Sequence, residues 1–406
     1  MKILIIADVY PPEISSASTL IQELALGLVG TGDEVFIVTT FPKHYLADGI
    51  QPVEFKELSD EAGIKVIRVK SLPLKKVSFV IRGISQLILP FLIFRKVKKY
   101  IKGNLDGVIV YSPPLPLSLA GNLVKNKYGA RFILNLQDIF PQNAIDLGVL
   151  KNKIIIKFFE AIEKFAYKNA DIITFHSEGG RRFVIENKHV PKEKVVSLPN
   201  WVDFSPYGIP SKKDFKKEYG LDGKKVLLFA GIMGPAQGLE FLVEVAEASQ
   251  KFEDIVFLLV GGGMEEEKIK FLVQKKQVKN IIFKNFISKD DYPDLVRSAD
   301  VGIVCLSEKN KTPFVPGKFL GYMAAGKSVL AFLNKESDAF DLVKKAECGY
   351  AIESGNLNGA VAAIQKINEM NFNDLNEIGL RGEKHAKENF SLDSAIVKLK
   401  KFISDR

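Results

Sequence analysis

Short, continuously apolar runs alternate with longer amphipathic stretches along the first half of the chain. Residues 2–7, 35–40 and 106–111 are such runs, which is typical of parallel strands covered on both faces. Residues 17–29 and 117–127 place apolar side chains at helical spacing instead. A helix between two strands implies a crossover connection, so the pattern predicts a parallel sheet with helices on its faces.

The second half starts the same alternation again. Its predicted strands are 225–230, 255–260, 281–284, 301–305 and 329–333, and its predicted helices are 238–250, 265–276 and 290–298, followed by helices from about 356 to 389. A short loop near Asn200 joins the two halves. We therefore expect an α/β protein of two Rossmann-like domains, one over 1–200 and one over 201–389, with a final segment over 390–406.

Composition supports a globular protein whose positive charge is unevenly spread. The 406 residues are 47% hydrophobic and 26% charged, and the net charge is +9. Residues 1–200 hold 27 Lys and Arg against 19 Asp and Glu. Cys305 and Cys348 lie in apolar strand contexts, so we expect no disulfide framework and a reducing cytoplasmic location. The N-terminus begins directly with a strand and has no signal-peptide pattern.

Much of the positive surplus falls in the segment 74–102. Its predicted membrane-facing basic residues are Lys75, Lys76, Arg82, Arg95, Lys96, Lys98 and Lys99. An apolar stripe that includes Ile84, Ile88 and Phe91 keeps helical spacing, and Pro90 is expected to kink or break the helix. The apolar centre, residues 87–94, is far shorter than the ~20 residues needed to span a bilayer.

Two interpretations of this basic segment stay open. It can lie in the plane of an anionic membrane surface, where basic side chains and apolar insertion both favour binding. The alternative is an ordinary core helix with a solvated basic end. Nucleic acid is a weaker explanation, since the chain contains no recognition motif and little aromatic interleaving.

A candidate anion site lies near Lys318 in the second half. Pro316 and Gly317 form a loop, residues 318–325 are predicted as a short helix, and Gly326 is a plausible left-handed cap. This arrangement would place the N-terminus of a helix beside a lysine, which suits a phosphate group. A Pro-Gly turn without any ligand is the alternative. The glycine-rich turn over 231–238 would let a phosphate approach the backbone closely, although such turns are common.

Polar side chains mark one strand end and one loop of the first half. Gln137 and Asp138 follow the predicted strand 131–137, where open α/β sheets bind ligands. Gln137 can hydrogen-bond a sugar but cannot act as a base near neutral pH. Ser15 and Ser16 lie in the loop after the first strand. A helix cap for Asp138 and a surface turn for the serines are the structural alternatives.

Three motifs carry a resemblance to a known family. They are Pro316-Gly317-Lys318 with Tyr322-Met323-Ala324-Ala325-Gly326-Lys327-Ser328-Val329, then Leu198-Pro199-Asn200-Trp201-Val202-Asp203, and Ala236-Gln237-Gly238-Leu239. In order and spacing the chain resembles the retaining family 4 glycosyltransferases, in their L-fucosamine-type branch. The resemblance covers essentially the whole chain. It implies the GT-B fold, with two facing Rossmann-like domains and a last helix that crosses back to the first domain.

The resemblance also implies roles for individual residues. Donor binding would involve Gly231, Gly234, Gln237, Gly238, Gly262, Phe286, Ile287, Pro316, Gly317, Lys318 and Phe319. Asp138 and Gln137 would be catalytic, and Ser15 and Ser16 would line the acceptor-side loop. Gly321 stands where the family usually has a glutamate that binds the ribose, and Pro235 and Gln237 stand where most relatives have a basic residue.

The function implied is transfer of a sugar from a UDP-sugar to a lipid-linked saccharide acceptor, in O-antigen or capsule assembly at the inner face of the cell membrane. No metal or other cofactor is expected, because the sequence has no Asp-x-Asp pair and no clustered metal ligands. Lys318 and helix dipoles would then stabilise the leaving diphosphate. Two alternatives stay open: a non-catalytic module that binds a membrane partner enzyme, and a UDP-sugar epimerase of the same architecture.

Overall fold

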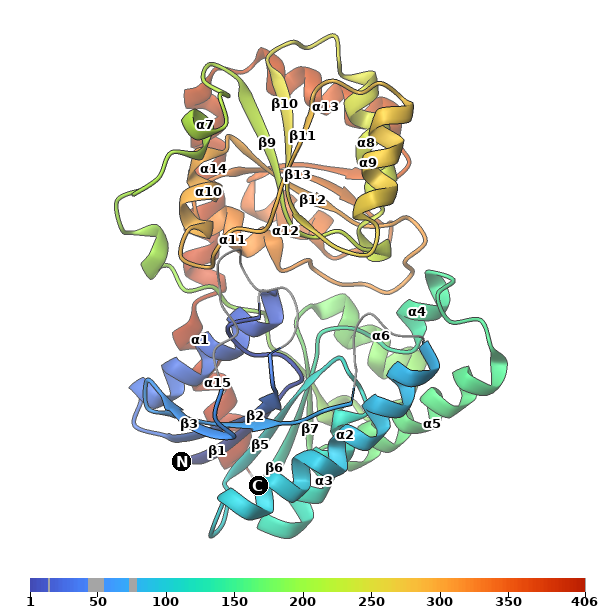
Figure 1. The fold of residues 1–406 in the computed structure, drawn as a ribbon, viewed down its shortest axis with the longest axis vertical. Coiled ribbons are helices and arrows are strands. Elements are labelled where there is room, and N and C mark those ends of the chain that lie inside the picture. The colour runs from blue at the N-terminus through green and yellow to red at the C-terminus, as the bar shows by residue number, and fades with distance from the viewer. Residues whose placement is uncertain (14, 43–54, 73–78, 406) are drawn as a thin grey trace. The chain divides into compact units, whose positions relative to one another are not determined.

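The computed structural model describes residues 1–13, 15–42, 55–72 and 79–405, with the side chains of the helix after 79 described from residue 83 onward. The chain divides into two compact units. Unit 1 holds Met1–Asn200 together with the C-terminal segment from Leu392, and unit 2 holds Trp201–Ser391. Both are Rossmann-like, with helices packed on a largely parallel sheet, so the predicted fold class is confirmed (Figure 1).

The sheet of unit 1 has eight strands in the order β3-β4-β2-β1-β5-β6-β7-β8. The strands are β1 Lys2–Ile6, β2 Glu34–Thr40, β3 Leu58–Glu61, β4 Ile64–Val69, β5 Gly107–Ser112, β6 Arg131–Leu136, β7 Ile172–Phe175 and β8 Val195–Ser197. All described neighbours pair in parallel except β3 and β4, which form an antiparallel hairpin at one edge. The central strands β1, β5 and β6 are buried except at the first residues of β1 and β6, as their apolar runs predict.

The helices of unit 1 lie on both faces of this sheet. They are α1 Ser16–Gly30, α2 Phe79–Tyr100, α3 Leu117–Tyr128, α4 Gln142–Asp146, α5 Lys153–Asn169, α6 Glu178–Lys188 and α15 Leu392–Ser404, with the 3-10 turn η1 Lys192–Lys194. Helix α3 packs between α2 and α5 on one face. Helices α1 and α15 pack together on the other face, where α15 is seen behind the sheet (Figure 1).

Unit 2 has an all-parallel sheet of six strands in the order β11-β10-β9-β12-β13-β14. The strands are β9 Lys225–Ile232, β10 Ile255–Gly262, β11 Ile281–Lys284, β12 Val301–Cys305, β13 Ser328–Leu333 and β14 Gly349–Glu353. Its helices are α7 Phe215–Glu218, α8 Leu239–Ala248, α9 Glu266–Lys275, α10 Tyr292–Ser298, α11 Lys318–Ala324, α12 Ala339–Ala346, α13 Leu357–Glu369 and α14 Phe372–Asn389, with 3-10 turns η2 Ser205–Tyr207 and η3 Pro235–Gln237.

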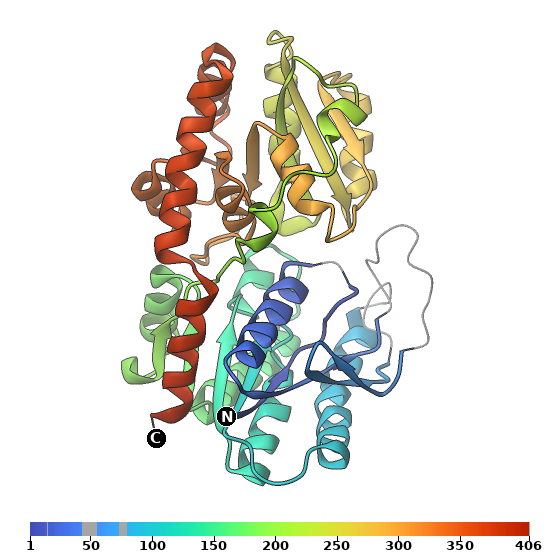
Figure 2. The same cartoon turned by 90° about the vertical axis from the view of Figure 1, so that its left-hand side faces the viewer.

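Two hydrophobic clusters hold the layers of unit 2 together. One includes Phe319 and Tyr322 of α11 and lies on one face of the sheet; the other includes Leu242 of α8 and lies on the opposite face. Figure 2 shows the long helix α14 running along unit 2 and α15 along unit 1. Both cysteines are free and buried, one at the end of β12 and one just before β14.

The chain passes between the units twice, at Asn200–Trp201 and at Ser391–Leu392. Within unit 2 the two crossing segments pair with each other. The Val202 N–H donates to the Phe390 carbonyl oxygen at 3.0 Å, and Val202 forms an isolated parallel bridge with Ser391. The two segments therefore leave unit 2 side by side.

Helix α2 runs through Pro90 without a break. Of the two expected effects of this proline, a kink or a break, the break is therefore wrong. The predicted apolar stripe faces solvent: Ile84, Ile88 and Phe91 are exposed, while Leu89 and Ile93 are buried. This exposure is compatible with the membrane-surface interpretation, which stays a prediction. Because residues 87–94 are apolar on almost every side, spacing alone did not identify which side packs on the sheet.

Candidate active site

Lys318 lies at the start of α11, at the carboxyl end of the unit 2 sheet. Its Nζ is 4.8 Å from the centroid of the Phe229 ring. A Cβ built on Gly231 would lie 3.2 Å from the same Nζ, so the ammonium group packs directly against a bare stretch of backbone. No carboxylate in the described part of the chain is within ion-pair distance. Burial lowers the pKa of Lys318 from its ordinary 10.5 to about 8.

The glycine turns next to Lys318 come together at the ends of β9 and β10. Gly231 pairs with Gly261, and Ile232 with Gly262, in the parallel register. Gly261 has a φ of +141°, and a Cβ there would lie 2.0 Å from the Gly231 carbonyl oxygen. Only glycine allows this close approach of the two strands. The structure thus brings Gly231 and Gly262 to the same sheet edge as Lys318.

The turn η3 closes on itself through Gln237. The Gly234 N–H donates to Gln237 Oε1 at 3.1 Å, and the Gln237 N–H donates to the Gly234 carbonyl oxygen at the same distance. Gly238 has a φ of +57°, and a Cβ on it would lie 2.8 Å from the Ser307 Cα. Gln237 therefore shapes the turn that presents this backbone, while its role in donor binding stays a prediction.

Helix α11 begins with fewer unpaired backbone N–H groups than a free helix N-terminus would have. The N–H groups of Phe319 and Leu320 donate to the carbonyl oxygens of Pro316 and Gly317, each at 3.2 Å. These two backbone N–H groups at the start of the helix therefore already have partners within the protein. Pro316 is buried and Gly317 is exposed. The assignment of this segment to an anion site stays a prediction.

Tyr322 ties α11 to the sheet. Its hydroxyl donates to the Leu228 carbonyl oxygen at 3.0 Å and accepts from the Ala230 N–H at 3.2 Å. The side chain is fully buried, and burial raises its pKa well above the ordinary value. Tyr322 therefore fixes the distance between α11, which carries Lys318, and β9, which carries Gly231.

Gly321 faces two tyrosine hydroxyls. A Cβ at this position would lie 3.2 Å from Tyr292 Oη and 3.4 Å from Tyr207 Oη. Burial raises the pKa of Tyr292 to about 12, so its phenol is neutral at physiological pH. Sequence reasoning missed both tyrosines, because residues 207, 292 and 321 lie in separate segments and no local motif marks them.

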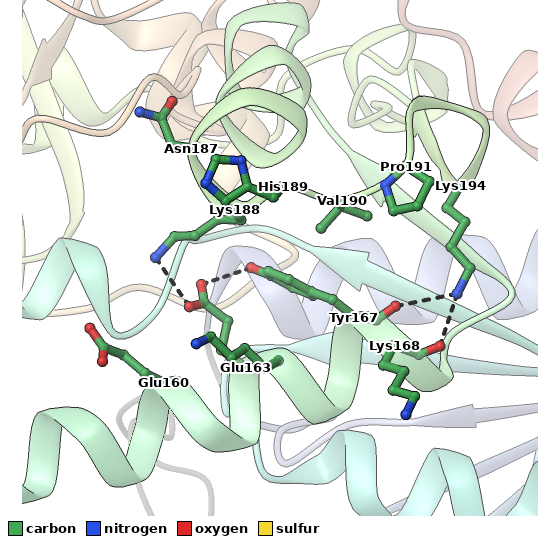
Figure 3. A pocket seen from close by; sticks show the side chains of 11 residues that line it. Glu160, Glu163, Tyr167, Lys168, Asn187, Lys188, His189, Val190, Pro191 and Lys194 are labelled. Atoms are coloured by element: carbon green, nitrogen blue, oxygen red, sulfur yellow. Dashed lines mark hydrogen bonds and ion pairs between the residues drawn. The ribbon is translucent and has the colours of Figure 1, made fainter.

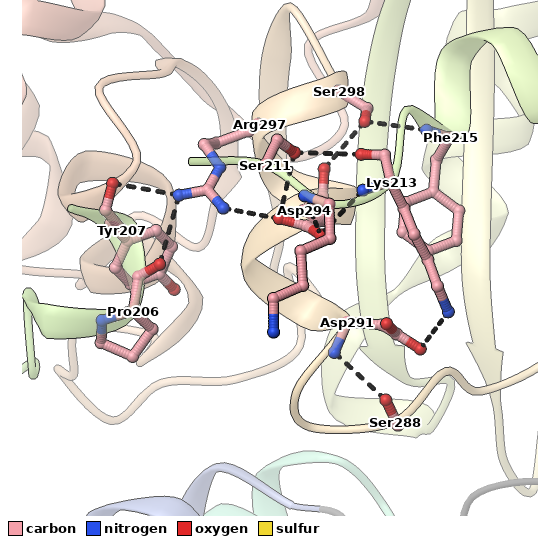
Figure 4. A network of polar contacts seen from close by, with 11 residues as sticks. Pro206, Tyr207, Ser211, Lys213, Phe215, Ser288, Asp291, Asp294, Arg297 and Ser298 are labelled. Atoms are coloured by element: carbon pink, nitrogen blue, oxygen red, sulfur yellow. Dashed lines mark hydrogen bonds and ion pairs between the residues drawn. The ribbon is translucent and has the colours of Figure 1, made fainter. Parts of the chain in front are cut away.

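A polar network around Asp294 holds the segment that carries Tyr207 (Figure 4). The buried Asp294 carboxylate accepts hydrogen bonds from Ser211 Oγ at 3.0 Å and from Arg297 Nη2 at 2.5 Å. It also accepts from the backbone N–H groups of Lys212 and Lys213. Arg297 Nη1 in turn donates to the Tyr207 carbonyl oxygen at 3.0 Å. Burial favours protonation of Asp294, but these donors outweigh it and lower its pKa.

Phe286 and Ile287 follow β11. The Phe286 ring lies near Gly262, where a Cβ would be 3.3 Å from its Cε2. Ile287 is partly buried against the core cluster that contains Phe319 and Tyr322. The predicted donor residues of unit 2 thus gather at one sheet edge, although their assignment to a nucleotide stays a prediction.

Unit 1 has its own group of polar side chains at the carboxyl ends of neighbouring strands. Asp8 follows β1, Tyr111 lies in β5 and Asp138 follows β6. Burial raises the pKa of Asp138 to about 6. Burial also raises the pKa of Tyr111, and the charges of Asp138 and Asp8 raise it further, so the three groups lie within electrostatic reach of one another. Sequence reasoning identified Asp138 but missed its two neighbours, which no motif contains.

Gln137 is held by other side chains of unit 1. Its Nε2 donates to Asn135 Oδ1 at 2.6 Å and to Asn200 Oδ1 at 3.0 Å, and Asn200 Nδ2 donates to Gln137 Oε1 at 2.7 Å. Both ends of the amide are engaged, so a structural role accounts for Gln137. Ser15 caps α1 by accepting from the Ser18 N–H at 3.1 Å, and Ser16 is exposed.

The basic residues of α2 do not all carry free charge. Lys96 and Lys99 both pair with Glu57, and Tyr100 hydrogen-bonds the same carboxylate. These hydrogen bonds, that of Lys96 first, lower the pKa of Glu57 to about 2. Part of the charge of these two predicted membrane-facing lysines is therefore compensated within the protein. Arg95 and Lys98 are exposed, whereas Lys75 and Lys76 and the side chain of Arg82 lie outside the described residues.

A cavity of about 540 Å³ lies between α5 and the turn after α6, away from the predicted residues (Figure 3). Buried Glu163 pairs with Lys188 Nζ at 3.1 Å and accepts from the Tyr167 hydroxyl at 3.1 Å. Burial raises the pKa of Glu163. Lys194 donates to the carbonyl oxygens of Tyr167 and Lys168. These polar groups of the cavity lining thus partner one another or the backbone.

The residues that the structure describes contain neither a metal site nor a membrane span. No group of three or more His, Cys, Asp and Glu side chains in the described segments could hold a metal ion. Among the helices for which coordinates are described, none combines the length and apolar character needed to cross a bilayer.

Two family models match the chain, one for each unit. Residues 17–201 match the glycosyl transferase 4-like domain, and residues 211–385 match the glycosyl transferases group 1 domain. WcaI of Escherichia coli (strain K12), provisionally named a colanic acid biosynthesis glycosyl transferase, is 24% identical over 80% of this chain and 82% of its own. The glycosyltransferase YtcC of Bacillus subtilis (strain 168), also provisionally named, is 27% identical over 73% of this chain and 72% of its own.

Solved structures share the fold across the whole chain. A sucrose-phosphate synthase from Thermosynechococcus elongatus superposes with a TM-score of 0.78 at 16% identity, covering 98% of this chain and 97% of its own. Anabaena HepE, solved in complex with UDP and glucose, gives 0.74 at 16% identity, with both chains fully covered. At such low identity these likenesses establish the architecture alone.

Proposed function

Because the chain joins a glycosyl transferase 4-like domain to a group 1 glycosyl transferase domain and is therefore a GT-B glycosyltransferase, we propose that it transfers a sugar from a UDP-sugar to a lipid-linked saccharide. The transfer retains the configuration of the sugar and serves O-antigen or capsule assembly, in the L-fucosamine-type branch. The relative WcaI, which is named for colanic acid biosynthesis, is consistent with a role in polysaccharide biosynthesis. WbjE, a Pseudomonas aeruginosa relative 24% identical over 76% of this chain, is consistent with glycosyl transfer.

The observation that carries the proposal is the Lys318 ammonium group. It is held against Gly231 at a glycine-lined sheet edge, and no carboxylate of the described residues neutralises it. A cation without a partner in such a place favours an anionic ligand, and a nucleoside diphosphate supplies two phosphates at once. HepE, of the same architecture, was solved with UDP-glucose.

In the proposed reaction the acceptor hydroxyl oxygen forms a bond to the anomeric carbon on the face that the phosphate leaves. The bond between that carbon and the phosphate oxygen breaks, and its electron pair goes to the nucleoside diphosphate. The acceptor proton passes to a phosphate oxygen of the leaving group. Lys318 stabilises the charge that develops there without a metal ion, and Asp138 orients the acceptor side of the reaction.

The acceptor and the location are part of the same proposal. A lipid-linked saccharide presents its sugar at the inner face of the cell membrane, so the enzyme would be a peripheral cytoplasmic protein. Support comes from the exposed apolar residues Ile84, Ile88 and Phe91 of α2, followed on the helix by exposed Arg95 and Lys98.

The direct experiment is turnover. The purified protein is incubated without added metal and with chelator, using a panel of UDP-sugars and undecaprenyl-diphosphate-linked saccharides. We expect one donor to give a glycosylated lipid with retained anomeric configuration. No product with any pair, or inversion of the anomeric centre, would contradict the proposal. Hydrolysis or epimerisation of a UDP-sugar without acceptor would instead favour the epimerase alternative.

Gly321 favours the non-catalytic module as a second candidate. The family resemblance puts a ribose-binding glutamate at this position, and the two tyrosine hydroxyls leave little room for a side chain there. A protein that binds UDP in neither its native form nor its Gly321→Glu variant, but still binds a membrane enzyme, would support this reading.

A further inference from the structure

Helix α5 of unit 1 carries an apolar face that nothing in unit 1 covers. Ile154 is 80% exposed and Phe158 46% exposed, and Phe165 is exposed as well. The spacing of these three residues, four and then seven apart, places them on one side of the helix. On the other side Phe159 and Ile162 are buried. This helix is therefore apolar toward both the core and the solvent.

Local packing holds this outer face in place. Phe158 contacts the buried Phe159 edge to face, with ring centroids 5.5 Å apart. Phe159 in turn packs edge to face on Phe140, at 4.9 Å. Asn152 caps the helix by accepting from the N–H groups of Ile154 and Ile155. The exposed aromatic ring is thus anchored from behind and cannot fold into the core.

Lysines border the apolar face. Those on and just before α5 are Lys151, Lys153, Lys157, Lys164 and Lys168, and all five are exposed. No carboxylate of the described residues lies within ion-pair distance of any of them. The acids of α5 are Glu160, which is partly exposed, and Glu163, which is buried and paired with Lys188. The solvent side of α5 is therefore apolar and strongly basic together.

We propose that α5 is a membrane-contact helix, which lies in the plane of an anionic bilayer with Ile154, Phe158 and Phe165 among the acyl chains and its lysines at the lipid phosphates. Charge decides the occupant: an uncompensated basic border suits anionic headgroups, whereas a second copy of the same face would bring lysines against lysines. The proposal rests on the membrane part of the proposed function and adds a helix that sequence reasoning did not select.

The position of α5 supports a shared docking face with α2. Helix α3 packs against both, so all three belong to the helical layer on one face of the unit 1 sheet. Exposed apolar residues of α2 and of α5 therefore lie on either side of α3. Binding to a membrane surface grows with the apolar area that is buried and with the charge that faces anionic lipids, so the two helices together should bind more strongly than either one alone.

The test measures co-sedimentation of the full-length protein with vesicles of equal parts phosphatidylglycerol and phosphatidylethanolamine. The double variant Ile154→Ser/Phe158→Ser should weaken partitioning by at least about tenfold, and Lys157→Glu/Lys164→Glu by roughly 30-fold, with a loss of salt sensitivity. The matched controls are Val397→Ser and Lys398→Glu, which change an exposed apolar and an exposed basic residue of α15 in the opposite layer. The controls should partition as wild type.

Several outcomes would overturn the proposal. They are failure of the wild type to bind these vesicles, α5 variants that bind as wild type, or equal losses in the α15 controls. A shift of oligomeric state in the α5 variants, seen by sedimentation velocity without vesicles, would show that a second copy covers the face instead. UDP binding by each variant is measured in parallel. Vesicle binding without UDP binding would leave this inference standing and remove the proposed transferase reaction. UDP binding without vesicle binding would remove this inference and the membrane location, and would leave the nucleotide-binding part of the proposed function standing.

Discussion

Gln137 and Asn200 exchange two hydrogen bonds, Gln137 Nε2 to Asn200 Oδ1 at 3.0 Å and Asn200 Nδ2 to Gln137 Oε1 at 2.7 Å. Asn200 is the last residue of unit 1 before the chain passes to unit 2, and it is 8% exposed. The amide pair therefore ties the start of the linker to the end of β6. These hydrogen bonds give Gln137 a structural role, and its catalytic role stays a prediction.

Replacing Gln137 with Ala should destabilise unit 1. The change leaves the buried Asn200 amide without its partner, at a cost of about 1–3 kcal/mol. Urea unfolding followed by circular dichroism measures the change, with the exposed Gln365→Ala as the matched control. If stability is unchanged while turnover disappears, Gln137 contacts substrate and the structural interpretation is wrong.

Asp294→Ala should destabilise unit 2 more strongly. It removes the acceptor for Arg297, Ser211 and two backbone N–H groups, and a broken buried ion pair costs about 3–5 kcal/mol. The folded pKa of Asp294 is lowered from 3.8, so its contribution is present above that value and is lost as the pH falls through the lowered pKa. Comparison of wild type and variant by thermal unfolding from neutral to acidic pH should show their difference shrinking below about pH 4. A constant difference would contradict this assignment.

The affinity for a nucleoside diphosphate should fall as the pH rises above about 8. The pKa of Lys318 in the free protein is about 8, and an anion binds the protonated form better. Affinity should therefore decrease by up to about tenfold per pH unit above that value, until the pKa of the bound form is reached. Calorimetry from pH 7 to pH 9.5 measures the slope, which Lys318→Met should abolish. A flat profile in the wild type would exclude Lys318 from the phosphate site.

Folding stability should change with pH in the opposite direction to nucleotide affinity, again because of Lys318. Since the folded pKa is lowered from 10.5, the unfolded chain holds the proton more tightly, and stability rises with pH between about 8 and 10.5. Lys318→Met should accordingly be more stable than wild type at pH 7, as measured by urea unfolding, while losing nucleotide affinity. A less stable Lys318→Met protein would contradict the view that this ammonium group is kept for binding.

Asp138→Asn should lower turnover without lowering stability, just as Lys318→Met should lower nucleotide affinity without lowering stability. Burial raises the folded pKa of Asp138 to about 6, so stability decreases as the pH rises from 3.8 to 6. The asparagine variant should be at least as stable as wild type at pH 7. If the carboxylate acts on the acceptor side, wild-type turnover should fall below about pH 6 and the variant should be nearly inactive. Full turnover in the variant would remove Asp138 from the reaction.

The fold followed from the sequence because parallel α/β units have a strong pattern. The predicted strands 281–284 and 301–305 agree with β11 and β12 to the residue, and Gly326 has the left-handed φ of +65° expected after α11. Strands and helix caps of this kind depend on residues that are adjacent in the sequence, so they can be predicted from it. The hairpin partner β3 was not predicted, since its sequence Leu-Ser-Asp-Glu lacks an apolar run.

The candidate site was only partly accessible to sequence reasoning. Lys318 could be selected because its own segment has a distinctive turn-helix pattern. Its depressed pKa, and the positions of Phe229 and Tyr292 around the site, depend on contacts between distant segments. The same limit applies to Lys96 and Lys99, whose charge is compensated by Glu57, about forty residues earlier. The outer face of α5 was overlooked because spacing alone does not show which of two apolar sides is buried.

The measurement that tests the central claim most directly is a calorimetric titration of the pure protein with UDP, without metal and with chelator, at pH 7. The account predicts saturable heat for the wild type and at least about a tenfold loss of affinity for Lys318→Met, the size expected for one charge-assisted contact. Lys327→Met, in which the nearby and partly exposed Lys327 of the same segment is changed, should bind as wild type. Absence of heat in the wild type, or equal affinity in Lys318→Met, would contradict the account.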